Sequence, residues 1–510
     1  MEASPDESAN ALRVSWTGAP RQQHLIARFV FLRGLGFVYS VAFLCLLLQF
    51  EGLIGEHGLM PVTRYLDRIG PRTSVLEWPT LFWLASGDAA LQLFAVLGLG
   101  LSVAVMLGIE SGVVMAILWV IYISFCHVGQ IFWGYGWEIL LLEAGFLSVF
   151  LCPIRSLAPM QARSPPPLLV VWAFYWLCFR VMFGAGLIKL RGDDCWTELT
   201  CLAYHYETQP IPNPLSAALH AMPMWFHKLG ALFNHYVELI APWMLLVGRR
   251  PRIVGALSIV AFQLMLIFSG NLSFLNWLTI VVCLPCLDDR FWRRWLPAVP
   301  AARGDSAEPS TLRTRTTAAL AIGICLLSIG PVVNMLSPRQ AMNTSFDPYH
   351  LVNSYGAFGS VGQIRHEVVL AGSEAEAPTA GDWREYGFHC KPGDVRAWPC
   401  IASPYHHRID WQMWFAALGR PQDQAWLIHM VDKLLRAQPA VLGLLAGDPF
   451  EGRRPRWVRA ELYRYAFSDE PGVRWERTRV GAYLPAMSLD DPRLRGYLGA
   501  RGFGPVSTGQ

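Results

Sequence analysis

Ionisable side chains recur inside the most apolar stretches of this sequence. They are Arg33, Glu138, Glu143, Arg180, Lys189, His235 and Glu238. Charged groups at membrane depth are costly, so they face one another or water. If the set converges, it forms a polar pocket that opens on one face of the membrane under a roof formed by residues 191–228. If it disperses, it forms interhelical ion pairs such as Glu143 with Arg180, which is the commoner outcome. The sequence leaves both interpretations open.

Other residues that could take part in chemistry occur in weaker patterns. No catalytic triad or nucleophile elbow can be recognised, so no catalytic residue is assigned. His205, His220 and His227 share one loop, but no histidine spacing matches a zinc-site template. We therefore predict no metal and no cofactor.

The elements that must position these residues are membrane helices. Hydrophobic residues make up 53% of the 510 residues, and several apolar runs approach the length that crosses a bilayer. We expect eight or nine transmembrane helices, at residues 26–49, 89–108, 112–128, 137–152, 168–190, 229–247, 253–270, 272–287 and 317–336. The arginines scatter over loops instead of forming a basic stripe, which argues against nucleic-acid binding.

The distribution of arginine in short loops predicts the orientation. Residues 1–24 are assigned to a cytoplasmic tail, 25–290 to the multi-pass membrane domain and 291–316 to an inside linker before the last helix at 317–336. Loops 50–88 and 191–228 then lie outside. Residues 337–490 also lie outside, followed by a tail at 491–510.

Residues 337–490 have the composition of a soluble domain. Residues 363–370, 383–389 and 457–467 resemble strands, while 411–418 and 422–435 have helical periodicity. The predicted fold class is therefore an all-α membrane bundle followed by a soluble α+β domain.

Four of the eleven cysteines lie in the predicted outer regions. An oxidising outer compartment would allow the pairs Cys195–Cys201 and Cys390–Cys400 to form disulfides. We expect at least the second pair to lie within bonding distance.

Two aromatic-rich segments are candidate contact surfaces. Asp410, Trp411 and Trp414 lie on one predicted helix of the outer domain and are either a client-binding face or, more commonly for such a stripe, part of the core. In the outer loop, the candidates are Tyr204, His205, Tyr206, Glu207 and Trp225. These residues either contact a client or membrane interface, or pack under the C-terminal domain.

Several strings, in collinear order, resemble one known family. They are FLRGLGFVYSVAFLCLLLQFEGLIGEHGLMPV at 31–62, GYGWEILLLEAGFL at 134–147, FRVMFGAGLIKL at 179–190, YHYETQPIPNP at 204–214, LVNSYGAFG at 351–359, KPGD at 391–394, IDWQMWFAALG at 409–419 and VRAELYRYAF at 458–467. By these strings the chain is similar to the lipase maturation factors over nearly its whole length.

This resemblance implies a chaperone-like, non-enzymatic membrane protein. Its animal relatives are in the endoplasmic reticulum membrane, where they help secreted lipases mature. The implied partners are membrane lipids and a secreted client such as a lipase, and a homo-oligomer is possible. The residue usage suggests a bacterial source, where the outer domain would be periplasmic instead of lumenal. The alternative is a membrane-embedded enzyme that uses the intramembrane Arg/Glu/Lys/His set, since the helical part also resembles, distantly, that of the vitamin K-dependent carboxylase.

Overall fold

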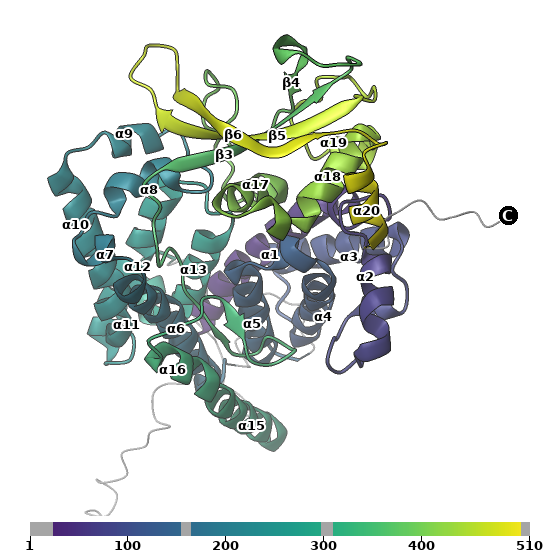
Figure 1. The fold of residues 1–510 in the computed structure, drawn as a ribbon. Coiled ribbons are helices and arrows are strands. Elements are labelled where there is room, and N and C mark those ends of the chain that lie inside the picture. Colours follow the sequence, from purple (N-terminus) through teal and green to yellow (C-terminus); the bar gives the residue numbers. More distant parts are fainter. Residues whose placement is uncertain (1–23, 155–164, 297–309, 501–510) are drawn as a thin grey trace, which may run out of the picture.

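Long apolar helices form a bundle that carries a small β-sheet at one end (Figure 1). The computed structural model describes residues 24–154, 165–296 and 310–500. The principal helices of the bundle are α1 (Leu25–Leu53), α3 (Asp88–Leu107), α4 (Gly112–Val128), α5 (Gly136–Leu151), α6 (Leu168–Gly192), α10 (Met224–His235), α11 (Ala241–Met244), α12 (Arg249–Ser269), α13 (Leu275–Cys283), α15 (Thr311–Leu327) and α16 (Ile329–Leu336). Short helices between them are α2 (Val62–Ile69), α7 (Asp194–Thr197), α8 (Leu202–Thr208), α9 (Ser216–His220) and α14 (Asp289–Trp292).

Five helical segments of the described chain are long and apolar enough to cross a membrane. They are α1, α3, α6, α12 and the combined segment Thr311–Leu336. Helix α4 and the segment Leu275–Cys286 are apolar but shorter. These helices make the chain a membrane protein, although they do not by themselves establish the eight or nine spans that the sequence predicts.

The predicted span 229–247 is helical but not regular. A π-helical turn, η4 (Tyr236–Ile240), joins α10 to α11. Leu229, Leu232, Trp243 and Val247 are exposed along this segment. Apolar exposure of that kind suits contact with lipid tails. The π-helical turn explains why no single regular helix covers the predicted span.

Contacts at the two ends of the bundle give the direction of α1 and the end at which α12 begins. At the end far from the sheet, the Asp289 carboxylate accepts hydrogen bonds from the first amides of α1, and Asp288 pairs with Arg249 at the start of α12. At the sheet end, Gln49 near the end of α1 donates to His406 O. Helix α1 therefore runs from the far end of the bundle to the sheet end, and α12 begins at the far end.

The C-terminal domain is built on a four-stranded antiparallel sheet in the order β4-β3-β5-β6. Its strands are β3 (Arg365–Ser373), β4 (Arg384–Glu385), β5 (Trp457–Phe467) and β6 (Trp475–Met487), and a separate two-stranded pair joins β1 (Thr344–Ser345) to β2 (Asn353–Ser354). The helices of this domain are α17 (Arg408–Leu418), α18 (Ala425–Leu435), α19 (Pro439–Leu442) and α20 (Pro492–Ala500). The prediction for 457–467 is confirmed, whereas 383–389 contains only two strand residues and β6 was not predicted.

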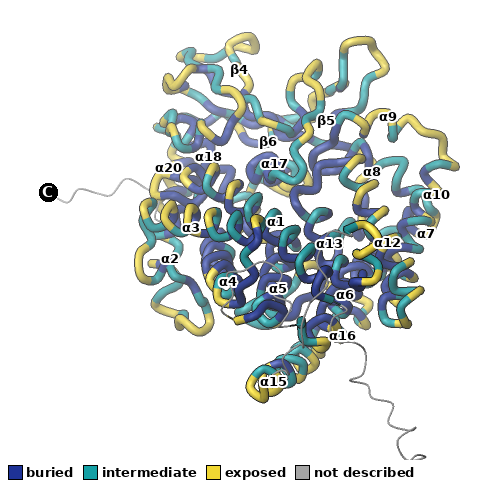
Figure 2. Tube along the Cα trace, turned by 180° about the vertical axis from the view of Figure 1, so that it is seen from behind, coloured by how far each residue is buried: buried dark blue, intermediate teal, exposed yellow. Residues whose placement is uncertain are grey.

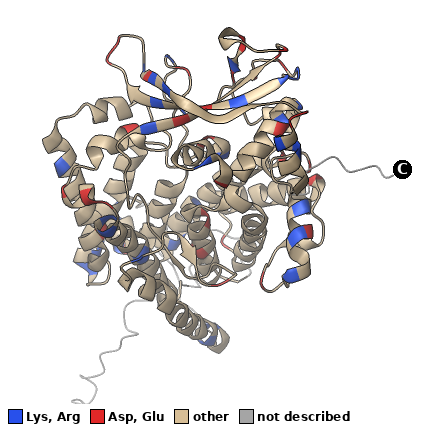
Figure 3. Cartoon of the chain, in the orientation of Figure 1, with Lys and Arg blue, Asp and Glu red and all other residues tan. Residues whose placement is uncertain are grey.

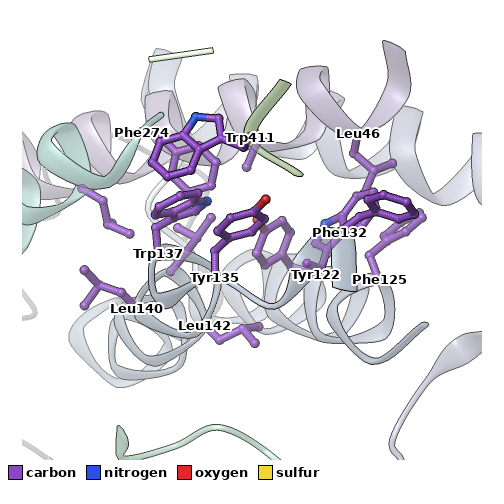
Figure 4. Close-up of a cluster of buried hydrophobic side chains, with 14 of the residues drawn as sticks. Leu46, Tyr122, Phe125, Phe132, Tyr135, Trp137, Leu140, Leu142, Phe274 and Trp411 are labelled. Carbon is purple, nitrogen blue, oxygen red and sulfur yellow. The ribbon is translucent and has the colours of Figure 1, made fainter. Parts of the chain in front are cut away.

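One hydrophobic core runs from the bundle into the C-terminal domain (Figure 2). At the junction, Tyr135 and Trp137 precede or begin α5 and stack on each other, and Trp411 of α17 lies edge-on to both (Figure 4). Trp411 of α17 thus faces the bundle. This continuity makes the sheet domain an integral part of the molecule.

The predicted tails and linker fall mostly outside the described residues. This applies to 1–23, 297–309 and 501–510. Within the tail expected at 491–510, however, residues 492–500 form α20, which buries Leu494 and Leu498. The ordered domain therefore extends beyond residue 490.

Candidate functional site

Glu143 on α5 and Arg180 on α6 form the ion pair that the sequence suggested. Both side chains are almost completely buried, and the guanidinium also donates to Asn353 O at 2.6 Å. The Glu143 carboxylate accepts further hydrogen bonds from the Asn353 amide, the Asn353 side chain and the Tyr355 hydroxyl. A buried charge needs such partners to offset its desolvation. The pair therefore anchors the β2 segment to the bundle.

Glu138 has a different partner, which the sequence analysis missed. Its Oε1 accepts a 2.8 Å hydrogen bond from Arg408 at the start of α17, and its other oxygen accepts one from the Tyr122 hydroxyl. Both Glu138 and Arg408 side chains are fully buried. Arg408 also lies over the Trp133 ring, 3.9 Å from its centroid. No local pattern could have found this pair, since the two residues are 270 positions apart.

Lys189 and Glu238 meet at the π-helical turn. The Lys189 ammonium donates to Glu238 Oε1 at 2.5 Å and to Asn234 Oδ1 at 3.0 Å. The neighbouring His235 has another partner, because its Nε2 bonds with Trp196 O. Asn234 and Glu238 thus contact the same ammonium, while His235 contacts the Cys195–Cys201 loop.

Arg33 belongs to a fourth cluster, at the end of the bundle far from the sheet. It pairs with Glu110, which also pairs with Arg28, at 3.2 Å and 3.1 Å respectively. Glu110 lies between α3 and α4, and its position after an apolar run was the available sequence signal. This pair joins α1 to the α3–α4 connection.

The seven ionisable residues are thus distributed among separate structural clusters. Charged residues are sparse within the bundle and frequent on the sheet and α2 (Figure 3). Among the described residues, each carboxylate of the set is paired with its own cation, and no described cavity encloses the set. This arrangement supports the interpretation as helix-packing ion pairs and does not favour a shared catalytic pocket.

Both predicted cysteine pairs form disulfides. The Cα atoms of Cys195 and Cys201 are 4.8 Å apart, and those of Cys390 and Cys400 are 5.3 Å apart. The other seven cysteines are free. Disulfides persist in oxidising compartments, so the two pairs are consistent with an exported location for this end of the molecule.

Most of the candidate loop residues pack against the C-terminal domain. The His205 ring lies edge-on to Phe358, and Tyr206 is buried. Glu207 accepts hydrogen bonds from the Phe467 amide and, through its carbonyl, from Arg365. Tyr204 is partly buried, whereas Trp225 is 63% exposed. The loop is therefore chiefly an interdomain contact, with Trp225 on the surface.

The candidate surface on α17 lies mostly in the interior of the molecule. Asp410 is fully buried and accepts hydrogen bonds from the Cys390 and Lys391 amides, while Trp411 is 4% exposed. Trp414 is half-buried and donates to Thr208 O. The apolar residues that α17 exposes are Phe415 and Leu418 instead.

Histidines near this junction are held neutral. Burial and the Arg408 guanidinium keep the pKa of His406 well below 6.5. Burial, followed by His389, lowers the pKa of His407 to about 4. His406 lies between Tyr135, Trp137 and Trp411, and neither ring nitrogen has a hydrogen-bond partner among the described residues.

A cavity of about 340 Å³ lies in the C-terminal domain, beside the Cys390–Cys400 loop. Its walls come from residues 385–395 and 397–399 together with Pro212 of the outer loop, Val369, Trp475 and Arg477. Arg477 donates to both oxygens of Glu385, so this charge is already paired. The cavity lies far along the chain from the intramembrane set and was not predicted.

Comparison with known proteins assigns the chain to a family. A model of the lipase maturation factor transmembrane domain matches residues 26–294, and a model of the C-terminal domain of the same factors matches residues 351–485. The chain belongs to the lipase maturation factor family.

Relatives match the chain over nearly its full length. Lipase maturation factor 1 of Bos taurus is 47% identical over 93% of this chain and 91% of its own. The corresponding human protein is 44% identical over 95% and 92%. Lipase maturation factor 2 of Xenopus laevis is 30% identical over 94% and 85%. No solved structure matches the chain.

The buried ion pairs connect the two domains that the family models match. The matched transmembrane and C-terminal domains are the two parts that Glu138–Arg408 and the Glu143 cluster join. Side chains from one family domain complete the hydrogen bonding of buried charges in the other.

Proposed function

We propose that the chain is a membrane-embedded maturation factor for secreted lipases. The observation that carries the proposal is the match of both family domains, in order, with relatives named for lipase maturation at up to 47% identity. The dispersal of the intramembrane charges into separate ion pairs supports a role without catalysis.

The proposed mechanism is holding. Apolar surface on the sheet end of the molecule binds a partly folded lipase until the lipase buries its own interface. Phe415 and Leu418 provide exposed apolar area on that end. Hydrophobic association of this kind needs no cofactor, because its free energy comes from removing apolar area from water.

The proposed location follows from the same arrangement. The nine predicted spans would put the sheet domain on the side opposite the N-terminus, where its disulfides would be stable. In a eukaryotic cell this side is the lumen of the endoplasmic reticulum, and in a bacterium it is the periplasm.

The test is co-expression with a secreted lipase in cells that lack their own family members. We expect the secreted lipase activity per milligram of lipase protein to rise, and the lipase to co-purify with the chain. A secreted hydrolase unrelated to lipases is the control and should gain nothing. Unchanged specific activity together with no co-purification would contradict the proposal.

A further inference from the structure

The cavity beside the Cys390–Cys400 loop lies on the face of the C-terminal sheet that points away from the hydrophobic core. Val369 of β3 forms part of its wall, whereas the neighbouring residues Val368 and Leu370 belong to the core. Successive residues of a strand point to opposite faces of the sheet. The cavity therefore opens on the side where a ligand from the surrounding compartment can enter.

The lysine and the arginine that line the cavity are both neutralised. Arg477 donates to both carboxylate oxygens of Glu385, and the Lys391 ammonium lies 2.9 Å from Glu367 Oε2. An anionic ligand consequently meets no unpaired lysine or arginine among the described residues of the lining. This charge balance favours a neutral ligand.

The Glu385–Arg477 pair nevertheless retains hydrogen-bonding capacity. Arg477 uses Nη1 and Nη2 on Glu385, and Nη1 also donates to the Tyr465 hydroxyl at 3.3 Å. A guanidinium has five N–H donors, and each carboxylate oxygen has two lone pairs. Because the Arg477 and Glu385 side chains are 28% and 38% exposed, the remaining donors and acceptors are accessible. The pair thus offers a donor and an acceptor side by side, which matches two adjacent hydroxyl groups.

Trp398 provides an open aromatic face at the same cavity. The Arg474 guanidinium lies over this ring, 3.5 Å from its centroid, and yet Trp398 is 66% exposed. Arg474 covers one face, so the exposure belongs to the other face. It also occupies the position that a cationic ligand would take on the ring. The open face suits the slightly positive C–H groups of a neutral ligand, because the face of an aromatic ring is negative.

The size of the cavity limits the ligand to a small one. Its volume of about 340 Å³ lies at the lower end of the range of about 300–1,000 Å³ that is usual for small-molecule sites. A sugar ring fits this space, carries adjacent hydroxyl groups on its rim and has apolar C–H groups on its faces. Sugars are attached to asparagine side chains on the surfaces of secreted proteins.

We propose that this cavity binds a neutral sugar residue that a secreted client carries as part of its glycan. The Glu385–Arg477 pair bonds adjacent hydroxyl groups of the sugar, and the open face of Trp398 packs against its C–H groups. Such a contact does not depend on the amino-acid sequence of the client. The assignment of the sugar to a client rests on the proposed function, whereas the sugar site itself rests on the cavity.

The test titrates the full-length protein with the methyl glycosides of glucose, mannose and N-acetylglucosamine. The detergent must lack a sugar headgroup, and saturation-transfer NMR detects binding in the millimolar range. Trp398→Ala removes the ring from the cavity. Trp225→Ala is the matched control, since Trp225 is 63% exposed and does not line the cavity. Thermal melts check that both variants are folded.

We expect at least one neutral glycoside to bind the wild-type protein and Trp225→Ala equally. Trp398→Ala should bind it about tenfold more weakly, a difference of about 1.4 kcal/mol. Trp398→Phe keeps an aromatic face and should recover most of the affinity. Salt should not weaken the binding, because screening acts on charged partners. The anionic sugar N-acetylneuraminic acid should not bind.

Three results would overturn the sugar site. They are no binding of any neutral glycoside by the folded wild-type protein, equal binding by Trp398→Ala and Trp225→Ala, and tighter binding of N-acetylneuraminic acid than of the neutral glycosides.

A second measurement tests the source of the sugar. The wild-type protein should capture a glycosylated, unfolded secreted lipase more strongly than the same lipase after enzymatic removal of its glycans, and Trp398→Ala should show no such difference. Capture that does not depend on the glycans overturns the assignment to a client glycan and leaves the maturation role standing. Failure to capture either form contradicts the proposed function, while the glycoside titration still decides on the sugar site.

Discussion

The buried carboxylate of Glu143 is held by several hydrogen-bond donors from other parts of the chain. Its carboxylate accepts hydrogen bonds from Arg180, from the Asn353 amide and side chain, and from the Tyr355 hydroxyl. These donors come from α6 and from the β2 segment, so one side chain fixes three parts of the chain. An amide could not accept from all of them.

We therefore predict that Glu143→Gln destabilises the protein by about 3–5 kcal/mol, the usual cost of leaving one member of a buried ion pair alone. The measurement is denaturant or thermal unfolding of the detergent-solubilised protein. Glu51→Gln, at an exposed position, is the matched control and should change stability little. An unfolding midpoint equal to that of the control would show that the cluster is dispensable.

His406 predicts a pH dependence of stability. Because burial and Arg408 hold its folded pKa far below 6.5, the unfolded chain binds more protons than the folded chain once the pH falls below about 6.5. His407, with a pKa of about 4, acts in the same direction. Stability should thus decrease as the pH falls from about 7 to about 5.

His406→Phe keeps the aromatic contacts and removes the titrating ring, so its stability should fall less over that range. Thermal unfolding at several pH values checks this. The same pH dependence in both proteins would mean that other groups are responsible.

The sequence predicted the partner of a side chain only where residue type or the expected compartment pointed to that partner. The Glu143–Arg180 pair and both disulfides follow from residue type and from the expected compartment. The Glu138–Arg408 pair could not be foreseen, because it depends on where α17 docks, and docking is decided by the packing of Tyr135, Trp137 and Trp411.

At the scale of elements, hydropathy predicted the positions of the helices well. It did not predict where a helix departs from regular α-helical geometry. The apolar run at 229–247 predicts one span, but the π-helical turn at Tyr236–Ile240 interrupts it. Hydrophobic periodicity does not reveal such a turn, because π-helical turns are rare single-turn features inside α-helices.

Strands were predicted where apolar residues alternate and missed where they do not. β5 was foreseen from its aromatic and β-branched residues, whereas β6 contains Gly481, Pro485 and several charges. Pairing with β5 decides its conformation. The composition that prevented the prediction of β6 also protects one end of this edge strand, because Pro485 has no amide hydrogen.

At the scale of the whole molecule, the C-terminal domain and the bundle stabilise each other. Arg408 neutralises Glu138, His429 contacts Leu59 O, and Gly52 of α1 lies against Ala440 O with no space for a Cβ. We therefore expect that the two family domains do not fold independently.

We predict that a chain ending at residue 340 does not form a stable bundle. Removal of the C-terminal domain leaves Glu138 without Arg408 and Glu143 without Asn353 and Tyr355, each a loss of a buried partner. Size-exclusion chromatography and protease resistance of the truncated protein in detergent provide the measurement. The variant Glu138→Gln in the truncated chain removes the carboxylate that has lost Arg408 and should recover part of the resistance. A truncated chain as resistant as the full-length protein would contradict the prediction.

The Glu138–Arg408 pair also sets an order of events during synthesis. The ribosome places Glu138 in the bilayer 270 residues before it makes the arginine that neutralises it. Until then, the Glu138 carboxyl of the nascent membrane domain lacks the cation that pairs with it. If translation stops early, this carboxyl stays unpaired and exposed to the quality-control machinery of the cell. The last third of the chain must therefore be synthesised before the buried charge in the first third is paired.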